Sequence, residues 1–270
     1  MELVSVYIIT FNRLDLLKRA IESVLNQSYT NLEIIVVNDC SDDGTCEFLT
    51  EISSKEKKIK ALHNKVNMGP CHSRNRAIDL ASGKYITGLD DDDYFHKDRL
   101  KILKENYNEE LSFVASIDGR KLFKSNYKYV YLKDMLQQNI VGNQVFTLTS
   151  YLKNIRFDEE MEAWQDYDVW FRLIEKYGKA LLLKENLQFI DTDTAPIRIS
   201  KNRVKIINAQ KLFLLKHGKH YSQLELLKRI INTSIRYKIP LDALGIPYRF
   251  ILTLDYEYIV KYLYSRIIIK

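Results

Sequence analysis

Short apolar runs alternate with helical apolar patterns along the first 100 residues. A run rich in β-branched residues at 3–10 precedes apolar residues at helical spacing from Leu14 to Leu25, which predicts a strand and then a helix. The same pair of patterns recurs, and it predicts strands at 33–38, 59–63 and 84–89 and helices at 43–52 and 70–80. Alternating elements of this kind indicate an α/β fold, a mostly parallel sheet with helices on both faces.

The pattern becomes irregular between about residues 110 and 160. Short strand candidates at 112–117 and 144–149 predict a mixed, loop-rich part of the sheet. A helix is expected at 166–177, where apolar residues form one stripe and Gly178 follows as a stop. Beyond residue 201 the pattern favours basic amphipathic helices.

Composition and charge narrow the class of protein. The 270 residues are 46% hydrophobic and 28% charged, which is typical of a folded chain and excludes a disordered or fibrous one. The net charge of +6 is uneven, because residues 201–270 carry 14 Lys/Arg against 4 Asp/Glu and the rest of the chain is net acidic. This distribution argues against a nucleic-acid-binding core and indicates an anionic surface that meets the C-terminal region.

The cysteines and the first residues of the chain indicate the cellular compartment of the protein. Cys40, Cys46 and Cys71 are too few and too irregularly spaced for a disulfide framework or a zinc site, which favours a reducing cytoplasm. The first residues lack a basic segment and a cleavage site, and no apolar run approaches 18 residues. We therefore expect neither secretion nor a membrane span.

Three unusually polar segments directly follow predicted strands: residues 10–13, residues 38–44 and the four consecutive aspartates 90–93. Ligands of open parallel sheets bind at the carboxyl ends of strands, so these segments are expected to line one site. Adjacent carboxylates repel one another unless a cation neutralises them, which predicts Mg²⁺ or Mn²⁺ with phosphates and water as further ligands. An acidic turn that caps the next helix is the alternative, and the position after a buried strand favours the metal.

Five motifs in order resemble family 2 glycosyltransferases of the GT-A fold, over about residues 3–200. They are residues 4–13, 35–45, 67–75, the DxD region at 89–93 and the acceptor-side segment 164–170. The chain departs from the family pattern at Ile9, Asn38, Cys40 and Gln165. The resemblance implies a GT-A (Rossmann-like) mixed, mostly parallel sheet, with a catalytic domain at 1–200 and a helical region at 201–270. Donor binding would use about 1–95 and acceptor binding about 96–200.

The resemblance also implies a set of donor-binding residues. Asp39 would accept the uracil N3 hydrogen, although an Asp after a strand also caps turns. Arg13 either approaches the uracil or simply starts a helix, and Arg74 either orients the metal loop or diphosphate or is a surface charge. Arg198, in a loop expected to fold over the donor, would reach the diphosphate. The full donor set is Thr10, Phe11, Asn12, Arg13, Asp39, Arg74, Asp90, Asp91 and Arg198.

Carboxylates are the residues expected to bind the metal and to act in catalysis. By the resemblance, Asp92 is the direct metal ligand, Asp90 faces the ribose or a metal-bound water, and Asp93 either positions the acceptor or supports Asp92. Asp166 is the candidate general base at a helix start, where the helix dipole favours its ionised form. An ordinary helix N-terminal acid is the alternative for Asp166. Trp164, available to stack on a sugar, and Gln165 complete the acceptor side.

These assignments predict an inverting, metal-dependent hexosyltransferase. It would move a hexose from a UDP-sugar to an acceptor hydroxyl with a β-linkage. The acceptor implied by bacterial relatives is an undecaprenyl-diphosphate-linked saccharide of O-antigen (lipopolysaccharide) or capsule biosynthesis. The basic C-terminal helices suit a peripheral place on the inner face of the cell membrane, or simply pack as a helical subdomain.

Two other functions stay open. A nucleotidyltransferase would need a Gly-rich, basic loop after the first strand, which residues 10–13 lack. A catalytically silent nucleotide-sugar-binding module is disfavoured by the presence of Asp92 and Asp166.

Overall fold

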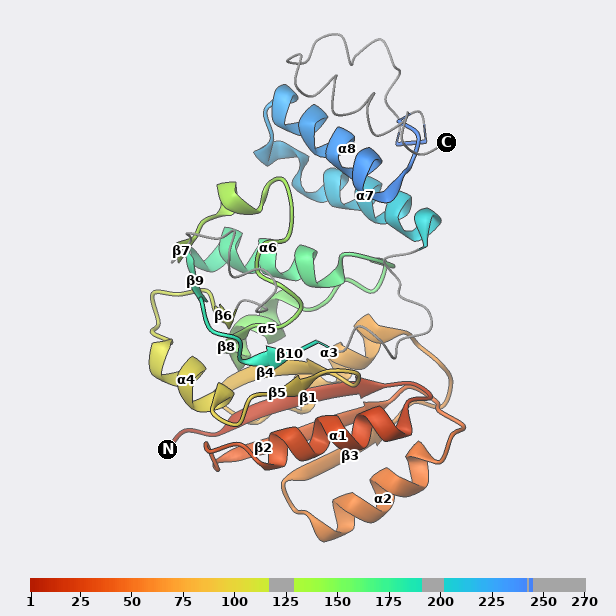
Figure 1. Cartoon of the computed structure of the whole chain (residues 1–270), viewed down its shortest axis with the longest axis vertical. Coiled ribbons are helices and arrows are strands. Elements are labelled where there is room, and N and C mark those ends of the chain that lie inside the picture. Colours follow the sequence, from red (N-terminus) through yellow and green to blue (C-terminus); the bar gives the residue numbers. More distant parts are fainter. Residues whose placement is uncertain (117–128, 191–201, 242, 245–270) are drawn as a thin grey trace. The chain divides into compact units, whose positions relative to one another are not determined.

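The computed structural model describes residues 1–116, 129–190, 202–241 and 243–244 (Figure 1). The chain forms two compact units, which are described separately. Unit 1 contains Met1–Leu132, Ile140–Glu159 and Gln165–Ala195. Unit 2 contains Lys133–Asn139, Glu160–Trp164 and Pro196–Lys270.

Four parallel strands form the first half of the sheet in unit 1. They are β1 (Val4–Thr10), β2 (Leu32–Asn38), β3 (Ile59–His63) and β4 (Tyr85–Asp90), in the order β3-β2-β1-β4. Strands β1 and β2 are buried almost throughout, as expected for central parallel strands covered on both faces. The predicted strands are therefore confirmed to within one residue at their ends.

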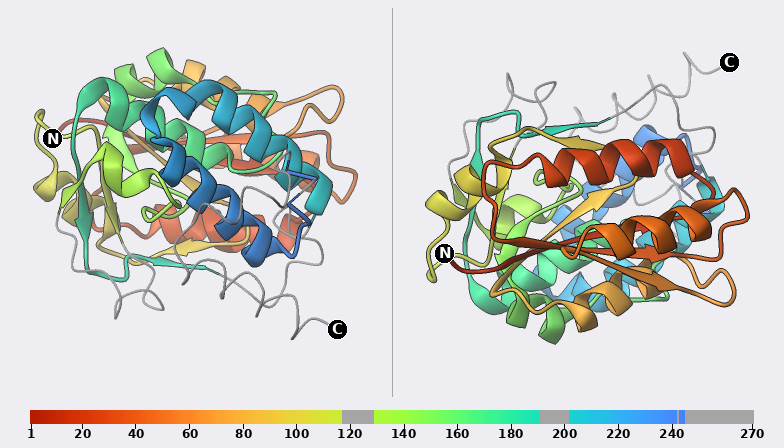
Figure 2. Two further views of the ribbon diagram at one scale, coloured as in Figure 1. Left: turned by 90° about the horizontal axis from the view of Figure 1, so that it is seen from above. Right: turned by 90° about the horizontal axis from the view of Figure 1, so that it is seen from below.

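The helices between these strands are α1 (Leu14–Leu25), α2 (Thr45–Lys55) and α3 (Pro70–Leu80). The chain moves outward from β1 through β2 to β3 and then returns to β4 on the other side of β1. Right-handed crossovers therefore place α1 and α2 on one face and α3 on the other. The view from below shows strands between α1 and α3 (Figure 2). Ile8, Val36 and Leu89 pack with Leu17 and Ile21 of α1 in the core.

The second half of the sheet is mixed, as the irregular pattern predicted. After β4 come β8 (Phe146–Leu148), β6 (Val114–Ser116), β9 (Ala180–Leu183) and β7 (Tyr129–Val130), of which β8 and β7 run antiparallel to their neighbours. A separate pair joins β5 (Tyr94–Phe95) to β10 (Gln188–Phe189). The remaining helices of this unit are α4 (Arg99–Asn106), α5 (Thr149–Ile155) and α6 (Gln165–Tyr177).

The regular structure described in unit 2 is helical. It contains most of the short helix η2 (Leu132–Met135), then α7 (Arg203–His217), η4 (Gly218–His220) and α8 (Gln223–Tyr237). Ser222 and Glu225 form a capping box at the start of α8. The buried Arg229 guanidinium lies over the rings of Phe213 and Trp164 and donates to the Leu136 carbonyl. Among the described residues, no helix has the length and apolar character needed to cross a membrane.

Candidate active site

The acidic run forms a tight turn at the carboxyl end of β4. The Asp93 N–H donates to the Asp90 carbonyl at 3.0 Å, so Asp90 and Asp93 form the base of a β-turn with Asp91 and Asp92 at its corners. Strand β5 begins at the next residue and pairs with β10, which anchors the far side of the turn. The turn therefore presents four carboxylates within four residues at the end of a buried strand.

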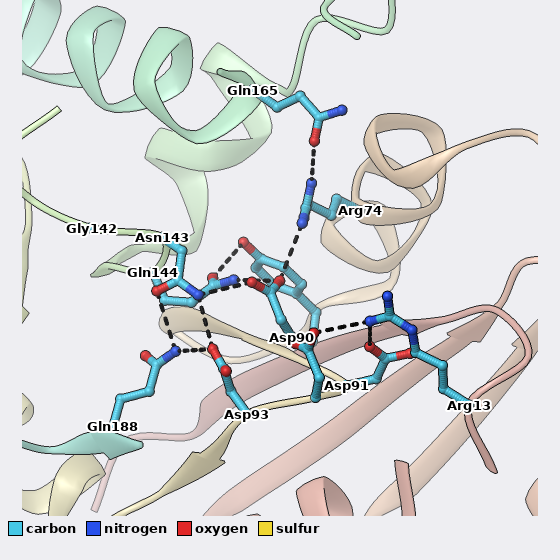
Figure 3. Close-up of polar contacts among 12 residues, drawn as sticks. Arg13, Arg74, Asp90, Asp91, Asp93, Gly142, Asn143, Gln144, Gln165 and Gln188 are labelled. Carbon is cyan, nitrogen blue, oxygen red and sulfur yellow. Dashed lines mark hydrogen bonds and ion pairs between the residues drawn. The ribbon is translucent and has the colours of Figure 1, made fainter. Parts of the chain in front are cut away.

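Arginines of α1 contact the corners of this turn. Arg13, the N-cap residue of α1, places Nη1 3.0 Å from Asp91 Oδ1 and 3.0 Å from Asp92 Oδ2 (Figure 3). Arg19, six residues further along, donates from Nη2 to the Asp92 carbonyl at 2.6 Å. The two roles left open for Arg13, an approach to the uracil or the start of a helix, did not include this contact: Arg13 stands at the start of α1, and its guanidinium lies on the acidic turn.

Asp90 is the centre of a second network. Its Oδ1 accepts from Arg74 Nη2 at 3.2 Å and from Gln144 Nε2 at 3.0 Å, and its Oδ2 accepts from Asn143 Nδ2 at 2.8 Å (Figure 3). The second Arg74 nitrogen donates to Gln165 Oε1 at 2.9 Å. Arg74 thereby links the acidic turn to the first residue of α6. This contact favours an orienting role for Arg74 over that of a free surface charge.

Burial raises the pKa of two of the four aspartates in the turn. Burial and the charge of Asp92 raise the pKa of Asp91 to about 6 in spite of Arg13. Burial and the charges of Asp90 and Asp92 raise the pKa of Asp93 to about 7, in spite of hydrogen bonds from Asn143 and Gln188.

These carboxylates suit a divalent cation of the Mg²⁺ or Mn²⁺ type, which prefers oxygen ligands. Among the described residues, no group of three or more His, Cys, Asp and Glu side chains could hold a metal ion alone. The residues therefore fit a cation shared between one or two aspartates and the phosphates of a nucleotide, and they do not fit a closed protein cage.

The loops after β1 and β2 are tied together. The Asp39 N–H donates to the Thr10 carbonyl at 2.9 Å, and the Asp42 N–H donates to Asn12 Oδ1 at 2.9 Å. Asn12 adopts a left-handed backbone with φ 53°, which Asn tolerates well. Phe11 is 46% exposed beside them. An exposed aromatic ring at the end of a central strand suits contact with a flat ligand.

Asp39 is buried and rigidly held. Its carboxylate accepts from the backbone N–H groups of Met68 (2.9 Å) and Gly69 (2.8 Å) and from Asn64 Nδ2 (2.5 Å). An ionised carboxylate offers about four acceptor positions, so these three bonds leave room for one more donor. Asp39 thus fixes the loop before α3 and keeps capacity to accept a ligand N–H.

Asp166 is the second residue of α6, next to Gln165. Burial raises its pKa, while the Tyr167 backbone N–H and the Arg74 charge act in the opposite direction. A raised pKa suits a group that must take up a proton at neutral pH.

Trp164 precedes α6 with a left-handed φ of 57°. Its ring contacts residues of unit 2, namely Phe213, Tyr237 and Arg229. Its role on a sugar therefore stays a prediction. Arg198 lies outside the described residues, and its role toward the diphosphate stays a prediction too.

Sequence reasoning missed the carboxamides around the turn: Asn143, Gln144 and Gln188. Gln188 Nε2 donates to Asp93 Oδ2 at 2.8 Å, which places β10 against the turn. Neutral amides carry no recognisable motif, and their distance of 50 or more residues from the aspartates hides the pairing. One indirect sequence sign concerns Gln144: Gly88, whose missing Cβ leaves space for Gln144 and the Tyr7 ring.

Comparison with known proteins agrees with the sheet described above. Residues 5–201 match the family described as Glycosyl transferase family 2. The chain is 35% identical over 217 residues to the putative colanic acid biosynthesis glycosyl transferase WcaA of Escherichia coli K12, covering 75% of this chain and 77% of WcaA. It is 32% identical over 207 residues to the E. coli UDP-Glc:alpha-D-GlcNAc-diphosphoundecaprenol beta-1,3-glucosyltransferase WfaP, covering 71% and 76%.

Two solved structures share the fold. The mannosyltransferase PcManGT from Pyrobaculum calidifontis, in complex with GDP-Man and Mn²⁺, has a TM-score of 0.65 at 17% identity and covers 90% of this chain and 72% of its own. S. aureus TarS 1-349 in complex with UDP-GlcNAc has a TM-score of 0.64 at 20% identity and covers 98% and 79%. The fold class is thereby confirmed as GT-A. The chain belongs to glycosyltransferase family 2, and it is a glycosyltransferase.

Proposed function

We propose that this protein is an inverting, metal-dependent hexosyltransferase that uses a UDP-sugar and forms a β-linkage. The observation that carries the proposal is the connection between Asp90 and Gln165 through Arg74. It places a metal-type acidic turn and the start of α6, with Asp166 as its second residue, in one polar network. Donor activation and acceptor deprotonation need such adjacent groups.

The donor side follows from the loops at the carboxyl ends of β1, β2 and β4. Asp39 accepts the uracil N3 hydrogen, and Phe11 supplies an exposed ring beside the base. Asp92 would hold the divalent cation, which would supply positive charge to stabilise the departing diphosphate. Arg74 keeps Asp90 in place through their 3.2 Å contact.

The acceptor side needs a base opposite the diphosphate. Asp166 takes the hydroxyl proton as the acceptor oxygen bonds to the anomeric carbon and the bond from that carbon to the diphosphate oxygen breaks. One displacement from the face opposite the diphosphate inverts the anomeric configuration. An α-linked UDP-hexose therefore gives a β-linked product.

The relatives support a polysaccharide-precursor acceptor. WfaP is named for glucosyl transfer from UDP-Glc to GlcNAc-diphosphoundecaprenol, and WcaA for colanic acid biosynthesis. We propose by analogy an undecaprenyl-diphosphate-linked saccharide of O-antigen or capsule assembly.

A lipid-linked acceptor implies that the protein acts at the inner surface of the cell membrane. Unit 2 supports this with apolar side chains exposed on α7, Val204 at 65% and Leu215 at 84%, among basic residues. Replacement of both Val204 and Leu215 by Glu should reduce flotation with anionic liposomes and leave transfer to a soluble acceptor analogue unchanged. Unchanged flotation would refute the surface role.

The test of the function is a panel of UDP-hexoses and GDP-mannose with lipid-diphosphate-linked GlcNAc or GalNAc. We expect acceptor-dependent release of UDP with Mn²⁺ or Mg²⁺ and a product of inverted configuration by NMR. Release of pyrophosphate would indicate a nucleotidyltransferase. Tight UDP-sugar binding with no turnover on any acceptor would indicate a silent binding module.

A further inference from the structure

One amide group spans the base of the acidic turn. The Asn143 Nδ2 atom donates to Asp90 Oδ2 at 2.8 Å and to Asp93 Oδ2 at 3.0 Å (Figure 3). Asp90 and Asp93 are the first and fourth residues of the β-turn. The two hydrogens of a single NH₂ group therefore connect the two side chains on either side of Asp91 and Asp92.

Asn143 is itself held from both sides. Gly142 has φ 106°, a conformation that favours glycine, and its carbonyl accepts from Trp170 Nε1 of α6 at 3.1 Å. Gln188 Nε2 donates to Asn143 Oδ1 at 3.3 Å and to Asp93 at 2.8 Å. The loop that carries Asn143 is thus fixed to α6 by a contact outside the turn, and to β10 by Gln188, which also contacts the turn.

The chemistry of the contact matters as much as its geometry. An arginine in this place would hold the carboxylates and also neutralise them, and it would compete with a metal ion. A carboxamide donates the same hydrogen bonds and carries no charge. Asn143 therefore restrains Asp90 and Asp93 without adding a further positive charge to those of Arg13 and Arg74, which already pair with Asp90, Asp91 and Asp92.

We propose that Asn143 is a positioning residue for metal-dependent donor binding. It fixes the spacing of Asp90 and Asp93 and thereby the direction in which the turn presents Asp92. This inference rests on the proposed use of a metal and UDP. Groups that orient direct ligands commonly change metal affinity by about 10–100-fold when they are removed.

The experiment is calorimetric titration of UDP into the full chain over a range of Mn²⁺ concentrations. Asn143→Ala should raise the Mn²⁺ concentration needed for half-maximal UDP affinity by about 10-fold. Excess Mn²⁺ should restore UDP affinity, and UDP affinity in EDTA should match the wild type. The matched control is Gln188→Ala, which removes a donor from the same Asp93 oxygen and the contact with Asn143 Oδ1 but leaves both Asn143 donors in place, so its shift should be within about 3-fold.

A second variant guards against a purely structural effect. Asn143→Asp keeps the shape, removes both donors and adds a charge, and it should shift the Mn²⁺ requirement at least as far as Asn143→Ala. Equal shifts in Asn143→Ala and Gln188→Ala, no shift in Asn143→Ala, or loss of UDP affinity in EDTA for both Asn143 variants would each overturn the inference. Failure of the wild type to bind UDP with or without Mn²⁺ would instead count against the proposed function.

Discussion

One buried carboxylate, Glu33, and the acidic turn at 90–93 occupy opposite ends of the parallel strands, and their surroundings differ. Near the start of β2, Glu33 accepts hydrogen bonds from Ser5, Lys60 and Ser82 and from the Gly83 N–H. Burial alone would raise the pKa of Glu33, but these donors outweigh it and lower the pKa to about 2. At the other end, burial and mutual repulsion raise the pKa of Asp91 to about 6 and that of Asp93 to about 7.

The opposite pKa shifts distinguish Glu33, which stabilises the fold, from the aspartates of the turn, which suit a functional site. Glu33 is fully supplied with donors, so its ionised form favours the folded state. The acidic turn keeps four carboxylates close together, three of which pair with Arg13 or Arg74, and mutual repulsion and burial oppose their ionisation unless a cation binds. Perturbation in this direction, beside the carboxyl end of a strand, is typical of a functional site.

The largest expected effect comes from the corner of the turn. Asp92→Ala should remove detectable transfer and metal-dependent UDP binding together, because the proposed direct metal ligand is lost. Asp91→Ala should be milder, since Asp91 is buried against Arg13 and is not the proposed metal ligand. UDP release and calorimetry with Mn²⁺ compare the two variants. Equal losses in both would show that the ligand is misassigned.

Asp166 adds a third kind of carboxylate, one that acts on the acceptor. Asp166→Asn keeps the shape but cannot take the proton, so turnover should fall by roughly 10²–10⁴-fold while UDP-sugar affinity barely changes. Because burial raises the pKa of Asp166, wild-type turnover should fall as pH drops through that raised value, above the ordinary 3.8. The variant should lack this acidic limb. Near-normal turnover in the variant would refute the base assignment.

Gly88 tests the packing behind the turn. A Cβ on Gly88 would lie 2.1 Å from Gln144 Oε1 and 2.4 Å from the Tyr7 ring, so Gly88→Ala should cost roughly 1–3 kcal/mol of unfolding free energy. Gly218→Ala is the control, because Gly218 is helical with φ −55° and its Cβ would meet nothing within 4 Å. Urea unfolding measures both. Equal stability of the two variants would contradict the packing argument.

Glu33 should give the smallest effect at neutral pH and a distinct pH dependence. Its folded pKa of about 2 lies below the ordinary 4.5, so its stabilisation is present above about pH 4.5 and is lost as pH falls toward 2. Glu33→Gln should cost roughly 1–2 kcal/mol at pH 7, and the deficit should shrink in acid. Unfolding curves from pH 7 to pH 3 test this. A deficit that stays constant with pH would argue against ionised Glu33 as its source.

The contrast also explains what could be predicted from sequence. The parallel strands, α1, α3 and the acidic run follow local patterns, and their predicted bounds hold within one residue. The partners of the run come from distant positions, such as Asn143 and Gln188, and neither amide carries a sequence signal. Glu33 carried no sequence signal either, because its hydrogen-bond donors lie on separate strands and loops. Chemistry carried by adjacent residues can be predicted from the sequence, whereas uncharged partners from distant positions become evident only in the structure.

We propose that the β1 and β2 loops bind the nucleoside and that the acidic turn supplies the response to metal. Calorimetry with uridine and with UDP, each in Mn²⁺ and in EDTA, tests it most directly. We predict that uridine binds with the same affinity in both conditions and that UDP affinity rises by about 10-fold or more with Mn²⁺, because only the diphosphate shares the cation with Asp92. A UDP affinity unchanged by Mn²⁺, or a uridine affinity raised as much as that of UDP, would contradict the account.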